Sequence, residues 1–148
     1  MTEKQNKIFR IVIVALVFAF TIFITQFQKK LQEDKNLVIT LKQYANEGND
    51  YCPFSVGSSG ILIVQKVYYR EKKTVVFEHR FLTHSKDSFD LESMKESFLP
   101  ITIEELESIK SLEVLRNKNI IFEYQYFDNQ NNEMFTIRAL FNTPIILE

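Results

Sequence analysis

The side chains of this chain that could act as acids, bases or metal ligands near neutral pH are two histidines, His79 and His84. An imidazole serves as a general base or as a metal ligand in that range. His79 is expected on a strand that ends before His84, so the two side chains would not share a face. No cysteine or carboxylate pair stands beside them at metal-ligand spacing. We therefore predict no metal site, with His79 packed on a strand and His84 in a solvated loop.

A hydrolase would also need a nucleophile, and the candidates are Ser58 and Ser59 in the Gly-Ser-Ser-Gly string that ends at Gly60. Either serine would need a histidine as its base. The string lacks the G-x-S-x-G spacing of a nucleophile elbow and the G-x-x-x-x-G-K-[ST] pattern of a phosphate-binding loop, so a plain turn explains it. No catalytic residue and no cofactor-binding residue is predicted. A small envelope hydrolase or ligand-binding enzyme that uses His79 or His84 is kept as an alternative.

Three glutamates, Glu104, Glu105 and Glu107, could be interpreted as a cation-binding cluster. They are expected in the first turn of a helix, where the helix macrodipole favours negative charge by about 0.3–1 kcal/mol, and this accounts for them without a metal. The single cysteine, Cys52, excludes an intrachain disulfide and a cysteine-rich zinc site. In an oxidising compartment Cys52 would be either buried or paired with another chain. Free cysteine is among the most buried residue types, so we favour burial.

An aromatic run near the C-terminus could line a binding groove, because tyrosine is enriched in interface cores. The run consists of Phe122, Tyr124, Tyr126 and Phe127. Packing in the core explains the aromatic side chains of the run that point inward. Only aromatic side chains that are exposed beyond this would indicate a partner.

The elements that would position these residues begin with an uncharged run over residues 11–28. A helix of that length rises about 27 Å, close to the thickness of the hydrocarbon core of a bilayer. The run is longer than the core of a cleaved signal peptide, and no pair of small residues marks a cleavage site. We expect an uncleaved transmembrane anchor over residues 11–28, preceded by a short cytoplasmic tail over residues 1–10. The numbers of basic residues on the two sides of the run are nearly equal, so the positive-inside rule hardly decides the orientation. A tail this short usually stays in the bacterial cytoplasm.

After the anchor, residues 29–48 are expected to form an amphipathic helix or linker, and residues 49–148 a globular domain. Apolar residues recur at spacings of three and four within residues 33–45, as on one face of a helix. Packing on the domain explains this stripe better than a dimer or partner seam does, because fewer than two heptads are available. Turn-forming residues then crowd residues 46–60.

Alternating apolar residues predict two β-hairpins in the domain. The first joins strands over residues 60–70 and 74–82, and the second joins strands over residues 120–126 and 135–141. Between the hairpins two helices are expected, as described next. The predicted fold class is therefore α+β: a single N-terminal transmembrane helix, then a small domain of two antiparallel β-hairpins packed with two or three amphipathic helices.

The two helices between the hairpins are predicted from their end signals. Asp90, or Ser88 before it, can cap the first helix, and Pro100 would end it. Thr102 and Glu105 match the capping box, in which the two side chains satisfy exposed backbone donors at a helix start. The second helix would end at residues 117–119.

Four segments resemble a pattern in uncharacterised membrane-anchored or lipidated envelope proteins of Bacteroides-like bacteria. They are Asn49–Pro53, Thr74–Phe81, Ile120–Tyr126 and Phe135–Ile137. In that pattern an Asn precedes a Cys-Pro or Leu-Pro step, and two hairpins rich in aromatic residues bracket a pair of helices. The resemblance covers about 90 residues. It implies an envelope location and this fold, and no known activity.

The net charge of −1 gives no basic footprint for a nucleic acid, so none is expected as a partner. No cofactor is predicted. The expected function is that of a membrane-anchored envelope protein whose domain is non-catalytic and binds another protein or takes part in an assembly. The expected partners are the membrane, through one spanning helix, and a protein. The expected location is the bacterial inner membrane, with the C-terminal domain in the periplasm. A specific version is an immunity-type protein that neutralises a toxin at the membrane.

Overall fold

The computed structural model describes residues 3–108 and 118–141, with side chains from residue 21 onwards except that of residue 108. The chain divides into two compact units, Met1–Val38 and Ile39–Glu148. One helix, α1 (Glu3–Asp50), runs from the first unit into the second. The second unit contains the strands, the other helices and the last part of α1.

The transmembrane anchor expected over residues 11–28 is contradicted. Among the residues that the structure describes, no helix has a stretch long and apolar enough to cross a membrane. In the part of α1 whose side chains are described, which begins at Thr21, the polar residues Gln26, Gln28 and Lys29 follow the apolar ones within three turns. Residues 11–20, the first half of the predicted span, lie outside the residues whose side chains are described, as does the predicted tail.

Three further expectations depended on that anchor and are corrected with it. They are the single-pass topology, the location in the bacterial inner membrane with a periplasmic domain, and the membrane as a partner reached through a spanning helix.

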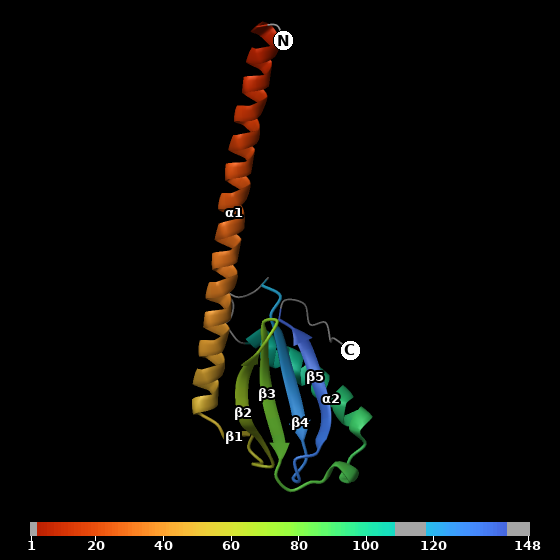
Figure 1. Cartoon of the computed structure of the whole chain (residues 1–148). Coiled ribbons are helices and arrows are strands. Elements are labelled where there is room, and N and C mark those ends of the chain that lie inside the picture. Colours follow the sequence, from red (N-terminus) through yellow and green to blue (C-terminus); the bar gives the residue numbers. More distant parts are fainter. Residues whose placement is uncertain (1–2, 109–117, 142–148) are drawn as a thin grey trace. The chain divides into compact units, whose positions relative to one another are not determined.

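Five strands form one mixed sheet in the order β1-β2-β3-β4-β5, as Figure 1 shows. The strands are β1 (Phe54–Val56), β2 (Leu62–Arg70), β3 (Thr74–Phe81), β4 (Ile121–Phe127) and β5 (Glu133–Leu140). All neighbouring strands are antiparallel except β3 and β4, which run parallel, with Thr74 opposite Ile121 and Arg80 opposite Phe127. Because β3 and β4 are parallel, the chain must return after β3 to the end of the sheet where β3 begins. Helix α2 lies in that connection.

The prediction of two separate hairpins packed with helices is therefore wrong, although two antiparallel strand pairs do occur where the alternating patterns lie. The parallel pairing of β3 with β4 joins both pairs into one sheet. The short edge strand β1 falls within the stretch predicted as turn, where Val56 pairs with Leu62 and Phe54 with Val64. Gly57 and Gly60 lie in the tight connection at φ of +72° and +64°, a conformation that favours glycine because it has no Cβ.

Helix α2 (Leu91–Ser108) is continuous through Pro100, so the prediction of two helices separated at that residue is wrong within the described residues. Asp90 does cap the helix, because its carboxylate accepts hydrogen bonds from the Ser93 backbone amide and, at 2.8 Å, from the Ser93 hydroxyl. Thr102 lies inside the helix, where its hydroxyl donates to the carbonyl of Phe98 at 2.9 Å, so it is not the start of a capping box. The second helix was predicted to end at residues 117–119. Residues 109–117 lie outside the described residues, and Lys118 and Asn119 are not helical.

The core lies on one face of the sheet, which α2 covers (Figure 1). Phe98 of α2 contacts Tyr126 and Phe135, with ring centroids 5.0 and 5.9 Å apart. The last part of α1 buries Leu41 and Ala45 completely. Burial of a large apolar side chain stabilises the folded state by about 1.5–3 kcal/mol, so this face supplies the main stabilisation of the unit.

The turn between β4 and β5 is held by Asp128, whose side chain is 1% exposed. Its carboxylate accepts hydrogen bonds from the backbone amides of Gln130, Asn132 and Lys86, the last of these in η1 (Lys86–Ser88), a single 3₁₀ turn. Burial would raise the pKa of Asp128, but hydrogen bonds from Asn132, Lys86 and Gln130 outweigh it and lower the pKa to about 2. The residue thus joins the β4–β5 turn to the segment that leads into α2.

Candidate functional site

A cavity of about 410 Å³ lies between the last part of α1, the buried face of the sheet and α2. Apolar and aromatic side chains from five elements form most of its lining: Tyr44, Phe54, Val56, Leu62, Val64, Phe77, Phe98 and Ile101. A smaller set of side chains brings polar atoms to the same cavity: Ser55, His79, Thr102, Glu105, Tyr124 and Tyr126. A mostly apolar cavity with a few polar groups is the usual form of a binding site.

His79 lies on β3 at the wall of this cavity and is 6% exposed. Its ring stacks on Tyr126 at 4.7 Å between centroids and lies 5.8 Å from Tyr124. Burial lowers the pKa of His79 to about 4, and hydrogen bonds to the backbone of Phe77 and Gln125 offset part of that effect. His79 is therefore neutral at neutral pH. It packs on strand β3, in agreement with the prediction that it lies packed on a strand.

The polar groups beside His79 are held in an environment that disfavours charge. Burial raises the pKa of Tyr124 well above its ordinary value, and the neighbouring Glu105 carboxylate raises it further. Burial also raises the pKa of Tyr126, while a hydrogen bond with Thr102 offsets part of the rise. Glu105 itself has a pKa raised by burial. Neutral phenols and one partly desolvated carboxylate therefore face the cavity.

A second cavity of about 570 Å³ adjoins the first, because Tyr44, Phe54 and Phe77 line both. It extends to the C-terminal end of α1, where Glu47, Gly48 and Tyr51 line it together with Val67. We call the two cavities together the groove. Large apolar side chains at the groove are exposed to solvent: Tyr51 by 78%, Phe54 by 41% and Ile101 by 53%.

The other candidates from the sequence do not come together with His79. His84 lies in the loop after β3, where its ring accepts or donates a hydrogen bond with Thr83 at 2.8 Å and contacts Phe89. Ser58 and Ser59 are exposed in the turn before β2, where the Ser59 hydroxyl accepts from the backbone amide of Ile61. Neither serine lines the groove, so the hydrolase arrangement that the alternative requires is not formed from these residues.

The three glutamates do not lie in the first turn of a helix, because α2 begins at Leu91. The macrodipole explanation is therefore wrong. All three glutamates are exposed, and of the three only Glu105 lines the cavity. Among the described residues, no three histidine, cysteine or acidic side chains lie close enough to hold a metal ion. Cys52 is only partly buried, contrary to expectation, and its thiol donates to the carbonyl of Gly48.

Two of the four aromatic residues predicted as a possible groove lining, Tyr124 and Tyr126, do line the cavity. Phe122 is completely buried in the core, and Phe127 lies on the opposite face of β4. The other aromatic residues of the lining, Tyr44, Phe54, Phe77 and Phe98, were not predicted as lining. Phe54 follows Pro53 in a stretch dense in turn residues, and Phe98 was taken for the end of a short helix.

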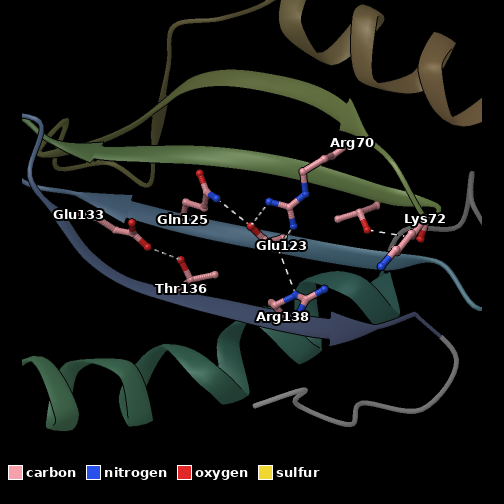
Figure 2. Close-up of polar contacts among 8 residues, drawn as sticks. Arg70, Lys72, Glu123, Gln125, Glu133, Thr136 and Arg138 are labelled. Carbon is pink, nitrogen blue, oxygen red and sulfur yellow. Dashed lines mark hydrogen bonds and ion pairs between the residues drawn. The ribbon is translucent and has the colours of Figure 1, made fainter.

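The opposite face of the sheet carries an ion-pair cluster around Glu123, which is 3% exposed (Figure 2). Arg70 from β2 pairs with both carboxylate oxygens, and Arg138 from β5 approaches Oε2 at 3.1 Å. The side-chain amide of Gln125 donates to Oε1 at 2.7 Å. Charged and amide donors therefore surround a buried carboxylate, which is an arrangement for holding three strands together rather than for chemistry.

No family model matches this chain, and no curated protein matches it in sequence. Its fold, a mixed five-stranded sheet with one helix packed across a face, is shared by solved structures. A protein of Pseudomonas aeruginosa described as secreted has a TM-score of 0.58 at 16% identity, over 71% of this chain and 89% of that chain.

Two further solved structures with this fold are pilotins of type II secretion systems. The pilotin of Vibrio vulnificus has a TM-score of 0.58 at 10% identity, over 74% of this chain and 92% of its own. The pilotin of Vibrio cholerae has a TM-score of 0.55 at 14% identity, over 74% of this chain and 93% of its own. At these identities the similarity shows the fold alone. The resemblance to envelope proteins of Bacteroides-like bacteria stays a prediction.

Proposed function

We propose that this protein is a non-catalytic binding module that holds an apolar segment of a partner protein in the groove. The observation that carries the proposal is an open, mostly apolar hollow flanked by large exposed side chains, Phe54 and Ile101. Exposed apolar surface beside a preformed hollow is typical of an interaction site. A segment with an apolar face that lies in such a groove is a common mode of recognition.

The polar groups of the groove support binding rather than catalysis. The imidazole of His79 is neutral, stacks on Tyr126, lies tilted against Tyr124 and is hydrogen-bonded to the backbone of Phe77, so it is held as part of the wall of the groove. Tyr124 and Tyr126 have raised pKa values and remain phenols, which makes them poor bases near neutral pH. These groups can orient a bound chain through hydrogen bonds.

The fold supports a role in protein assembly. Two proteins that share it are components of type II secretion systems. We propose that the partner of this chain belongs to a protein assembly in the same general way, and that the protein contributes by holding one segment of that partner.

Site-specific photo-crosslinking in the native cell tests this function. Benzoylphenylalanine is introduced at Ile101, at the groove, and in a matched strain at Leu82, which is 46% exposed and does not line the groove. We expect one protein to be captured from Ile101 and not from Leu82, with mass spectrometry identifying it. Equal capture from both positions, or none from either, would contradict the proposal.

A further inference from the structure

We infer that the partner segment held in the groove is an extended strand, which adds to the free edge of β1 and carries apolar residues at alternate positions. The inference rests on the proposed function and specifies the conformation and the side-chain pattern of the partner. It depends on the direction of the backbone groups of Ser55 and on the place of β1 at the groove.

The backbone groups of β2 alternate between its two neighbours, β3 and β1. The amide of Leu82, just after β3, donates to the carbonyl of Ile61 at 2.9 Å, in the same register that pairs Leu62 with Phe81. Successive residues of a strand direct their N–H and C=O groups to opposite sides. Ile61 and Ile63 therefore bond toward β3, and the backbone groups of Leu62 and Val64 point toward β1.

The same alternation leaves the backbone of Ser55 directed away from the sheet. Val56 pairs with Leu62 and Phe54 pairs with Val64, so Phe54 and Val56 use their N–H and C=O groups to bond β2. Ser55 lies between them and is exposed. Among the described residues β1 is the outermost strand on its side of the sheet (Figure 1), so the donor and the acceptor of Ser55 are open to another strand.

This free edge opens at the groove. All three residues of β1, Phe54, Ser55 and Val56, line the first cavity. The strand at the other edge of the sheet, β5, is longer, but none of its described residues lines either cavity. A segment that bonds to β1 therefore lies at the apolar hollow, whereas one that bonds to β5 does not.

The position of β1 also predicts the side-chain pattern of the partner. A residue of the added strand opposite Ser55 would point its side chain to the face of the sheet away from the groove. The residues before and after it would point to the groove face, beside Phe54 and Val56. Phe54 is 41% exposed, and Ile101 of α2, which lines the same cavity, is 53% exposed. Two apolar side chains separated by one residue would cover both.

A strand suits this edge better than a helix does. A helix satisfies its own backbone groups, so a helix that covered β1 would remove water from the N–H and C=O of Ser55 without replacing their hydrogen bonds. An extended segment supplies one acceptor and one donor to the same residue. Added strands of this kind obtain affinity from the main chain and specificity from pockets for alternate side chains.

N-methyl scanning of bound peptides tests the inference. The probes come from a phage-displayed library of random peptides of about ten residues, which span roughly 33 Å when extended. They are selected on the full-length protein and kept if Ile101→Ser, at an exposed residue of the groove, releases them. The library imposes no conformation. Each selected peptide is synthesised with a fluorescein label and with one amide methylated at a time, and fluorescence anisotropy gives the dissociation constants.

We expect the selected peptides to carry two apolar residues separated by one residue. Methylation of the amide of that middle residue, which would donate to the carbonyl of Ser55, should weaken binding by about tenfold, because a hydrogen bond is lost and an acceptor is left unpaired. Methylation at either neighbouring residue is the matched control. It should change binding by less than about twofold, because those amides point away from β1 in a strand.

Changes in the protein give an independent readout. Ser55→Pro removes the N–H that would donate to the peptide, at an edge position where proline is tolerated, and should weaken binding by about tenfold. Ser55→Ala keeps the N–H and should change binding by less than about twofold. Hydrogen exchange of the wild-type protein does not depend on the folding of a variant. Saturating peptide should slow exchange at the Ser55 amide by about tenfold or more and leave that of the exposed Ser58 unchanged.

Each contrary result has a distinct meaning. Tolerance of methylation at every position, with unchanged exchange at Ser55, would overturn the inference and leave the proposed function standing. Sensitivity at several successive amides would assign the groove to a helix, and dimers in sedimentation that Ser55→Pro dissociates would assign the edge to a second copy. Either result overturns the inference. Failure to select any peptide that Ile101→Ser releases would overturn the proposed function as well, and binding of a fluorescent fatty acid would then assign the groove to a lipid.

Discussion

The imidazole of His79 lies against the phenol ring of Tyr126, with centroids 4.7 Å apart and ring planes inclined by 22°. The two residues stand on neighbouring parallel strands, opposite each other in register. This contact keeps a titratable ring in the apolar core, and it makes the stability of the fold sensitive to acid.

Acidification should destabilise the protein through His79. Burial lowers its pKa from 6.5 to about 4, so the unfolded state binds more protons than the folded state between these values. The stability contribution is complete above pH 6.5 and is lost as pH falls toward 4, by about 3 kcal/mol. Urea unfolding at pH 7 and pH 4 should show this loss in the wild-type protein. The variant His79→Phe keeps a stacked ring but does not titrate, so between pH 7 and pH 4 it should lose about 3 kcal/mol less of the free energy of unfolding than the wild-type protein does. An equal loss in both proteins would contradict the prediction.

Removal of the Glu123 carboxylate should weaken the sheet. Glu123→Ala leaves Arg70 and Arg138 facing each other without their shared partner, and we expect a loss of about 2 kcal/mol in the free energy of unfolding. The arginines remain partly exposed, so water moderates the effect. A double-mutant cycle with Arg138→Ala measures the coupling directly. Glu133→Ala is a matched control on the neighbouring strand, where an exposed carboxylate accepts from Thr136, and its change should stay within about 0.5 kcal/mol.

The β4–β5 turn should loosen when Asp128 loses its carboxylate. In Asp128→Ala the backbone amides of Lys86, Gln130 and Asn132 lose their acceptor. We expect a lower Tm and faster hydrogen exchange at those three amides, with little change in the strands. The pKa of Asp128 is lowered, so its contribution is present above pH 3.8 and is lost as pH falls through about 2. Asp87→Ala, at an exposed residue of η1, should change neither quantity.

Replacement of Pro100 should stabilise helix α2. Pro100 is exposed inside the helix and cannot donate to the carbonyl one turn earlier, a defect that costs roughly 3 kcal/mol in a helix interior. Proline also restricts the unfolded chain, which offsets about 1 kcal/mol of that cost. We therefore expect Pro100→Ala to raise the free energy of unfolding by about 1–2 kcal/mol in urea titrations. An unchanged or lower value would mean that the helix is interrupted at residue 100. Glu96→Ala reports the effect of an added alanine alone.

The sequence located the strands whose pairing is local. Alternation of apolar and polar residues marked β2, β3, β4 and β5, and the short polar turns between partners indicated antiparallel pairs. It did not indicate that β3 and β4 pair with each other, because that contact depends on residues far apart in the chain. The order strand, helix, strand was the available signal, since a crossover through a helix is how parallel neighbours are connected.

The errors in the helices arose from local rules that tertiary packing overrode. Proline in a helix interior is unfavourable, so a break at Pro100 was the natural prediction, yet Phe98 on one side and Leu106 on the other are held against the domain core. Thr102 matched a capping box, but its hydroxyl bonds to the previous turn of the same helix. Local signals describe what a segment prefers in isolation, and buried contacts on both sides can outweigh them.

The groove was only partly visible in the sequence. Tyr124 and Tyr126 were identified as possible lining because alternation along a strand shows which residues share a face. Ile101 was expected between two helices and Glu105 in the first turn of the second one, so the direction of their side chains could not be inferred. Phe54 belongs to a strand of three residues, too short to produce a periodic pattern.

The parallel pairing of β3 with β4 also has a consequence for how the protein forms. The strands at the middle of the sheet come from distant parts of the chain, with α2 between them. During synthesis the first half therefore emerges with the inner edge of β3 unpaired, and the sheet closes only after β4 has left the ribosome. Closing that long loop loses chain entropy before the strand contacts repay it, which slows folding in proteins with such topology. The nascent chain would accordingly stay open until β4 has emerged, a window in which chaperones can engage it.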